Sequence, residues 1–422
     1  MVTSSLVLVR TFRVLIAVLV ILLWMTQVRI WWQHIAGSWH RWVNGDFDHY
    51  YLTAWRIVSS SEVYCALFSA QERALFGFGP SEVLQPTNPP LLALFLTPIA
   101  FLTPFGAWIV YTVLSLAVVV ASCVVVMRAA GASSQRGRIG VLLLVLFSSP
   151  LLWLLHFSQV QGFILGCVVW ALICADRKPI TAGILLGLAI ALKGYVLPLI
   201  PFAVVTGRYR LAGVTAIATG AFSLLPYLID ERLSLLEYLR CGVPHVEAFA
   251  LAYSGNQGMA GVLKALGFLT LLPWTGLAVE DIAHGAYVVG MSVWLASGFV
   301  VGAILPRRFP SGPGLALMAA ASVLVAPLSW PHYFLIVWPY LLWRWQRIQW
   351  YEKIIIWFSA PLSPVYISSN SSSSVMEAIT SFEGSLFMWL PALIFFVQFG
   401  VIAWRHVQEE RAAAAEPSTR LT

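Results

Sequence analysis

The chain has 422 residues, of which 59% are hydrophobic and only 10% are charged. A soluble domain of this length would carry far more charge, and apolar runs of about 18 residues recur along the sequence. The composition therefore predicts a polytopic membrane protein. The net charge of +7 is mostly arginine in short loops, which the positive-inside rule explains without nucleic acid as a partner.

The first apolar segment, 14–32, is predicted to be an uncleaved anchor with a cytoplasmic N-terminus. Arg10 and Arg13 precede it, no small-residue cleavage site follows, and it ends in tryptophans. The positive-inside rule assigns five basic clusters to the cytoplasm: 128–138, 176–179, 207–210, 306–309 and 344–353. The apolar segments between them are predicted spans: 105–127, 139–156, 160–175, 180–193, 195–206, 211–229, 285–305, 313–327, 333–345, 353–367 and 386–404. With the anchor, we expect about twelve transmembrane helices and two cytoplasmic termini.

Two further apolar segments, 89–103 and 259–273, do not fit as spans, because either crossing would put a basic cluster on the wrong side. We expect both to be re-entrant or interfacial helices on the outer face. Basic residues flank 180–206 at both ends, which predicts a hairpin of two short arms with KGYVLP (193–198) at its tip.

These assignments predict a single transmembrane domain, residues 1–404, which includes a first outer loop at 33–104 and a second at 230–284. The remaining residues, 405–422, form a polar cytoplasmic tail that we expect to be disordered. Outer-side polarity is concentrated at 33–88, 230–258 and 368–385. The first two stretches hold the candidate chemistry, whereas the third is serine-rich and is predicted to be a flexible loop.

The first outer loop carries two carboxylates, Asp46 and Asp48, among aromatic residues. One interpretation is a general base near the membrane surface, with Tyr50, Tyr51 and Trp55 as a stacking platform for a sugar. The alternative, which spacing alone favours, is an interfacial helix with a solvated aspartate pair and aromatics at headgroup depth. A metal held by Asp-x-Asp is not expected, since no second acidic or histidine cluster completes such a site.

Two of the four lysines, Lys193 and Lys264, fall in the outer half of the predicted domain, at the hairpin tip and in a re-entrant helix. A charge at the bilayer centre costs about 2–3 kcal/mol, so it persists best beside an anion such as a lipid phosphate. The alternative is a snorkelling lysine without a ligand. We favour the phosphate site for Lys193, whereas both interpretations of Lys264 stay open.

Three polar turns fall on the same predicted side as Asp46: HFSQVQG (156–162), YSGNQGMAG (253–261) and APLSWPHYF (326–334). Gln159, Asn256 and Gln257 are candidates to line a site in these turns. His332 is a candidate donor to a phosphate or a sugar hydroxyl, although a lone histidine at a membrane rim is more often structural.

The five cysteines are scattered. Cys123, Cys167 and Cys174 fall inside predicted spans and are interpreted as small apolar side chains. Cys65 and Cys241 fall in outer loops and are able to pair, but two unpaired thiols are the favoured interpretation.

The motifs taken together resemble glycosyltransferase family 87, polytopic bacterial enzymes that include polyprenyl-phosphomannose-dependent mannosyltransferases. The matching segments occur in the family's order: GDFDHYY (45–51) with Ala54 and Tyr64, NPPLLALFLTPIAFLTP (88–104), SQVQGFILG (158–166), AGILLGLAIALKGYVLP (182–198), GNQGMAG (255–261) and APLSWPHY (326–333). The chain departs from the family at Lys264, where many members have arginine, and at His332, where two adjacent histidines are common.

The resemblance implies the C-type glycosyltransferase (GT-C) fold, all-α, in a bacterial inner membrane with the active site on the periplasmic or extracellular side. It implies Asp46 as the catalytic base and Lys193 near the donor phosphate, where we also expect Lys264 and His332. The expected substrate contacts are Asp48, His49, Tyr50, Tyr51, Asn88, Gln159, Asn256, Gln257 and Trp330. No metal or cofactor is implied.

We therefore expect a membrane glycosyltransferase that moves a sugar, mannose by the resemblance, from a polyprenyl-phosphate donor to a lipid or glycan hydroxyl with inversion. Transfer of arabinofuranose, or of another pentose or hexose, by the same fold is one alternative. A lipid-linked sugar flippase or transporter is another, although the two halves of the sequence show no internal repeat.

Overall fold

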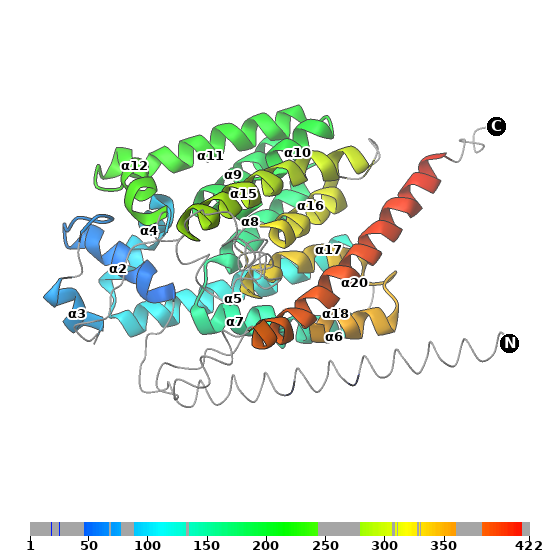
Figure 1. Cartoon of the computed structure of the whole chain (residues 1–422), viewed down its shortest axis with the longest axis horizontal. Coiled ribbons are helices and arrows are strands. Elements are labelled where there is room, and N and C mark those ends of the chain that lie inside the picture. Colours follow the sequence, from blue (N-terminus) through cyan, green and yellow to red (C-terminus); the bar gives the residue numbers. More distant parts are fainter. Residues whose placement is uncertain are drawn as a thin grey trace.

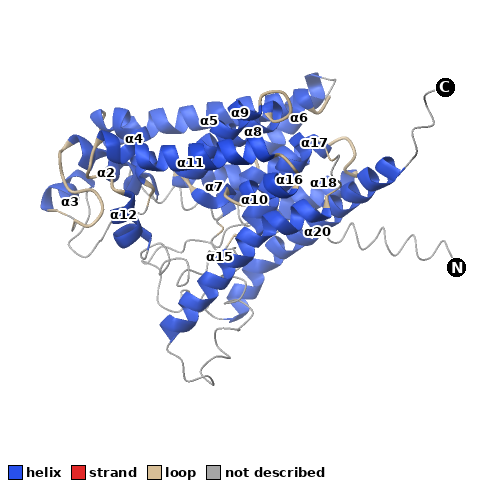
Figure 2. Cartoon of the chain, turned by 90° about the horizontal axis from the view of Figure 1, so that it is seen from above, coloured by secondary structure: helices blue, strands red, loops and turns tan. Residues whose placement is uncertain are grey.

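The computed structural model describes residues 46–66, 69–76, 88–131, 135–243, 279–305, 309, 311–326, 329, 331–359 and 382–415, together with the isolated positions 18 and 25. These residues form helices joined by turns and loops, without a strand among them (Figure 2). The elements are α2 (Asp46–Val58), α3 (Ala70–Phe76), α4 (Pro90–Leu96), η1 (Thr97–Phe101), α5 (Pro104–Ala129), α6 (Gln135–Leu146), α7 (Ser149–Phe157), α8 (Gln161–Cys174), α9 (Pro179–Leu192), η2 (Gly194–Val196), α10 (Leu199–Val205), α11 (Tyr209–Ile229), α12 (Leu235–Glu237), η3 (Tyr238–Gly242), α15 (Val279–Ile304), α16 (Ser311–Val325), η5 (Pro331–Val337), α17 (Trp338–Arg344), α18 (Trp350–Ser359) and α20 (Phe382–Ala415).

Within the described ranges, α5 and α11 are long and apolar enough to cross a membrane, and the bent pair α6–α7 makes a third if it is one span. The 26 residues of α5 reach about 39 Å, more than the roughly 30 Å of a hydrocarbon core. Thr103 caps this helix by accepting a hydrogen bond from the Gly106 amide, and Pro104 occupies its first turn. Six shorter apolar stretches of helix in the described chain, among them Val288–Ile304 within α15, have 10–17 residues.

The predicted hairpin at 180–206 is present as α9, η2 and α10. Gly183 lies against Val214, and Gly187 lies against Ala218, so α9 and α11 run parallel at close approach. Because α9 and α11 run in the same direction, α10, which lies between them in the chain, runs in the opposite direction. A side chain at Gly187 would collide with the α11 backbone, which is why this contact requires a residue without Cβ.

The basic segments meet at one end of the helix bundle. Arg208 donates to Ser311 Oγ (2.6 Å) and to the Phe309 carbonyl (2.7 Å). Gln346 donates to the Gly131 carbonyl (3.4 Å). The opposite end, at the left of Figure 1, gathers α2, α3, α4 and α12. The first outer loop and the start of the second are therefore neighbours in space, although more than a hundred residues separate them in the chain.

Three predicted segments differ from the structure. The span 139–156 is broken between α6 and α7 with a bend of 56°, because Pro150 begins a new helix and cannot continue the preceding one. The span 333–345 is divided into η5 and α17. The segment predicted to be a disordered tail is helical to Ala415, since Arg405 pairs with Glu352 (2.9 Å).

Several predictions fall on residues outside the described ranges. These are the first anchor, 14–32, the re-entrant segment 259–273, most of the second outer loop, and the serine-rich stretch before α20. The segment 89–103 is described as α4 and η1, which together reach only about 18 Å and pack against α2.

Candidate active site

The carboxylates Asp46 and Asp48 occupy the first turn of α2, where the positive end of the helix dipole favours negative charge. Asp46 is half-buried, so its carboxylate is within reach of a ligand. Asp48 is only 3% exposed. Burial, and then the charge of Asp46, raise the pKa of Asp48 from 3.8 to about 8. Asp48 is therefore mostly neutral at pH 7.

The buried face of α2 packs on α5 through aromatic rings. Phe47 and Tyr50 lie 5.3 and 6.2 Å from the Tyr111 ring, measured between centroids. Tyr51 donates to the Leu102 carbonyl (2.8 Å). Tyr50 and Tyr51 therefore fill the α2–α5 interface, which leaves little of either ring free to stack on a sugar as the sequence suggested.

The C-terminal part of α2 is held by a buried ion pair. Arg56 donates from Nε and Nη2 to the two carboxylate oxygens of Glu72 on α3. It also donates from Nη1 to the Val63 carbonyl (2.9 Å). Both side chains are at most 3% exposed. A buried pair with every charge bonded specifies one geometry, so it fixes the direction in which α2 projects Asp46.

A disulfide joins the two outer loops. Cys65 and Cys241 are bonded, with their Cα atoms 5.6 Å apart. The preference for unpaired thiols was therefore wrong, because the chain brings positions 176 residues apart into contact, which spacing does not reveal. Beside the bond, Arg232 donates to the carbonyls of Ser61 and Ile57, at 3.1 Å each. Disulfides persist in oxidising compartments.

Lys193 lies at the C-terminal end of α9, where the helix gives way to the hairpin tip. Its ammonium donates to Gln159 Oε1 (3.1 Å) and lies 5.0 Å from the centroid of the Tyr333 ring. Tyr195 stacks on the same Tyr333 ring, with the two ring centroids 4.8 Å apart. Across the described chain, no carboxylate lies within ion-pair distance of Nζ, although Asp46 is within electrostatic range.

Gln159 connects the lysine to α2. Its Oε1 also accepts from the Tyr50 hydroxyl (2.7 Å), so residues from α2, the α7–α8 turn and α9 meet at one oxygen. Within the α7–α8 turn, Ser158 has a left-handed backbone with a φ of 49°. Its hydroxyl accepts a hydrogen bond from Trp108 Nε1 (2.7 Å).

Buried polar atoms gather around this network. Each of the following has no hydrogen-bond partner in the part of the chain that the structure describes: Asp48 Oδ1, Tyr111 Oη, Ser115 Oγ, Gln159 Nε2, both amide atoms of Gln161, Tyr195 Oη, and both ring nitrogens of His332. Burying such a group unpaired costs about 1–3 kcal/mol. A cluster of them therefore indicates a site that a polar ligand completes.

His332 belongs to this cluster, since its ring lies 4.9 Å from that of Tyr333, over which Lys193 sits. Asn88 precedes α4, and its carbonyl accepts from Tyr64 (3.0 Å) while its Nδ2 is buried without a partner in the described chain. His49 is half-buried, and its carbonyl bonds Thr53 on the same helix. Lys264, Asn256, Gln257 and Trp330 lie outside the described residues.

Sequence reasoning missed Tyr111, Ser115 and Tyr195 as members of the cluster. The available signal was a hydroxyl within an otherwise apolar segment, which is weak because a serine in a membrane helix often bonds its own backbone. Ser122, also on α5, does so with Val118 (2.7 Å). Ser115 makes no such bond among the described residues, a difference that the sequence does not show.

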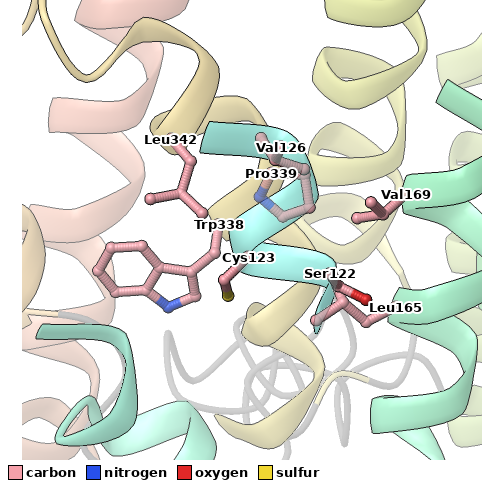
Figure 3. A pocket seen from close by; sticks show the side chains of 8 residues that line it. All are labelled: Ser122, Cys123, Val126, Leu165, Val169, Trp338, Pro339 and Leu342. Atoms are coloured by element: carbon pink, nitrogen blue, oxygen red, sulfur yellow. The ribbon is translucent and has the colours of Figure 1, made fainter. Parts of the chain in front are cut away.

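A shallow gap between α5, α8 and α17 lies apart from this cluster and has no room for a water molecule (Figure 3). Its lining is apolar apart from Ser122, whose hydroxyl is already bonded. The side chains of Cys123 and Trp338 approach it from facing helices (Figure 3). It therefore lacks the polar groups that would recognise a sugar or a phosphate.

The family model of glycosyltransferase family 87 matches residues 87–339, which are more than half of the chain. The chain belongs to glycosyltransferase family 87. The family match includes Asn88, Gln159, Lys193 and His332 but begins after α2, so it does not extend to Asp46 and Asp48.

A curated relative from Mycobacterium tuberculosis is named polyprenol-phosphate-mannose-dependent alpha-(1-2)-phosphatidylinositol mannoside mannosyltransferase. It is 28% identical over 275 residues, which cover 61% of each chain. The family 87 chain thus spans about three fifths of the length of the relative it matches. No solved structure matches it.

Proposed function

We propose that this family 87 protein transfers a sugar, mannose, from a polyprenyl-phosphate donor to a hydroxyl of a glycolipid or glycan. One observation carries the proposal. The Lys193 ammonium, unpaired with any carboxylate in the described ranges, lies among buried polar atoms that also lack partners there. A phosphate bearing a sugar satisfies both, because it supplies the anion and the hydroxyls.

In the proposed reaction, the acceptor oxygen attacks the anomeric carbon of the donor. A carbon–oxygen bond to the acceptor forms, the bond to the phosphate oxygen breaks, and the acceptor's proton passes to Asp46. The anomeric centre inverts, and polyprenyl phosphate leaves. Lys193, with His332, stabilises the charge that grows on the departing phosphate. Lys264, which lies outside the described residues, is proposed for the same role from its place in a predicted re-entrant helix of the outer half.

Asp46 is the proposed base because it is the accessible carboxylate of the pair. A general base must be ionised and within reach of the hydroxyl that it deprotonates. Asp48 is buried, and its pKa of about 8 keeps it mostly protonated at pH 7. Two adjacent carboxyl groups with divergent environments are a recurring arrangement at catalytic sites.

The sugar and acceptor are proposed from the relative, whose name specifies a polyprenol-phosphate-mannose donor and a phosphatidylinositol mannoside acceptor. The location on the outer face is supported by the Cys65–Cys241 disulfide, which favours an oxidising compartment for α2 and α12. The basic segments at the other end of the bundle are consistent with a cytoplasmic side there.

The test uses purified protein in nanodiscs with polyprenyl-phosphate mannose or arabinofuranose as donor and total membrane lipid as acceptor. A labelled product from the mannose donor is expected, with loss of about 10²-fold or more in Asp46→Asn. Activity is expected to survive EDTA, since no divalent ion is proposed. Product from arabinofuranose alone would change the sugar. Donor transport without turnover would replace the transferase proposal with a flippase.

A further inference from the structure

Gln159 is bonded so that only one of its two amide atoms is used. Lys193 Nζ (3.1 Å) and the Tyr50 hydroxyl (2.7 Å) both bond Oε1. An ammonium has donors and no acceptor, so the atom that faces Lys193 must be the amide oxygen and not the nitrogen. The orientation of the amide is therefore determined by its partners, and Nε2 faces elsewhere.

That Nε2 group is fully buried and has no partner among the residues that the structure describes. An amide NH₂ carries two donors, and leaving them unpaired inside an apolar bundle is costly. The side chain is held in place nevertheless, because the Tyr50 hydroxyl of α2 and the Lys193 ammonium at the end of α9 both bond its oxygen. The unused donors therefore point to an acceptor that a ligand supplies.

The geometry identifies the acceptor group. At most about 5 Å separate Nε2 from Lys193 Nζ, because both are arranged around the same amide oxygen. Two donors at this separation are able to bond two oxygens of a single phosphate, with ordinary hydrogen-bond lengths on each side. A sugar hydroxyl would satisfy Nε2 but would leave the ammonium without its anion.

We propose that Gln159 both positions Lys193 through Oε1 and binds the donor phosphate through Nε2, so that lysine and amide form one phosphate clamp. This assignment rests on the proposed function for the identity of the lipid. It differs from the sequence expectation, in which Gln159 contacted the sugar. Tyr50 contributes indirectly, since its hydroxyl restrains the same oxygen from the α2 side.

The experiment measures the affinity of purified protein in detergent for a polyprenyl monophosphate without sugar, by the change in tryptophan fluorescence. Gln159→Leu is expected to weaken binding about 10-fold or more, the effect of losing hydrogen bonds to a charged group. Binding of a neutral polyprenol, which lacks the phosphate, should be unchanged. Equal phosphate affinity in wild type and Gln159→Leu would overturn the clamp.

Two further variants separate the amide from the shape of the turn. Gln159→Glu keeps an oxygen for Tyr50 and Lys193 but replaces Nε2 by a second oxygen, so it should fold normally and still lose about 10-fold in phosphate affinity. Trp108→Phe removes the bond to Ser158 and leaves the amide intact, so its affinity should match wild type. Wild-type affinity in Gln159→Glu, or equal losses in Trp108→Phe and Gln159→Leu, would refute the inference.

The same measurements distinguish the two proposals. Phosphate binding that depends on Gln159, without sugar transfer from any donor tested, would leave the clamp standing and refute the transferase. Transfer that is independent of Gln159 would do the reverse. A wild-type protein that does not bind polyprenyl phosphate would overturn both.

Discussion

Replacing Asp48 with asparagine should stabilise the protein at neutral pH. Asp48 is 3% exposed, and burial together with Asp46 raises its pKa from 3.8 to about 8. An aspartate in the unfolded chain is ionised at pH 7, so folding must bind a proton to this side chain. Asparagine has nearly the same shape and carries no charge in either state, so the variant avoids that cost.

The magnitude depends on pH in a defined direction. The folded-state pKa of Asp48 is raised, so protonated Asp48 does not destabilise the wild type below pH 3.8. Its destabilising effect grows progressively as the pH rises from 3.8 through about 8. At 1.36 kcal/mol per pKa unit, the advantage of Asp48→Asn is less than about 1 kcal/mol at pH 4, about 4 kcal/mol at pH 7 and about 6 kcal/mol at pH 9, as upper limits.

The assay is thermal unfolding in detergent at these three pH values, followed by tryptophan fluorescence. The transition of Asp48→Asn should rise above that of the wild type, and the difference should grow with pH. Asp176→Asn is the matched control, because Asp176 is exposed at the other end of the bundle and should show no such trend. A difference that is constant with pH, or a loss of stability in Asp48→Asn, would refute the burial argument.

The two other structural predictions concern the outer disulfide and the hairpin. Cys65→Ser should destabilise the protein by up to about 5 kcal/mol, the chain entropy released when a loop of 176 residues is no longer closed to Cys241. Cys174→Ser is the control, and equal melting temperatures of the two variants would contradict the prediction. Gly187→Ala should lower both stability and transfer activity, since its Cβ would lie 2.8 Å from an α11 backbone nitrogen, whereas Gly220→Ala meets nothing within 4 Å. Equal behaviour in melting and turnover assays would show that the α9–α11 approach is not restrictive.

Several elements were predictable because they depend on local composition. The helix α5 follows from an apolar run that begins at a Thr103 cap and ends after Arg128. The hairpin around Lys193 follows from basic residues on both sides of a segment too short for two full spans. The short helical segment at 90–101 was predicted not to be a span because a crossing there would put a basic cluster on the wrong side of the membrane.

Other features were not predictable because they depend on which segments meet. The bend between α6 and α7 required knowing that Pro150 starts a new helix and does not kink an existing one. The continuation of α20 beyond Arg405 depends on Glu352, which lies on α18. A polar segment whose ion-pair partners lie elsewhere in the chain is predicted to be disordered, because its own residues supply no buried apolar face.

For this family 87 protein, the sequence by itself determined a helical membrane protein, the candidate residues Asp46 and Lys193, and their expected side of the membrane. These follow from residue type and from charge relative to apolar runs, which are local properties. Only the tertiary structure decided that Asp46 is accessible while Asp48 is buried, that Cys65 bonds Cys241, and that Gln159 joins α2 to Lys193. The physical reason is that burial and hydrogen bonding arise from contacts between distant segments, and no local pattern specifies them.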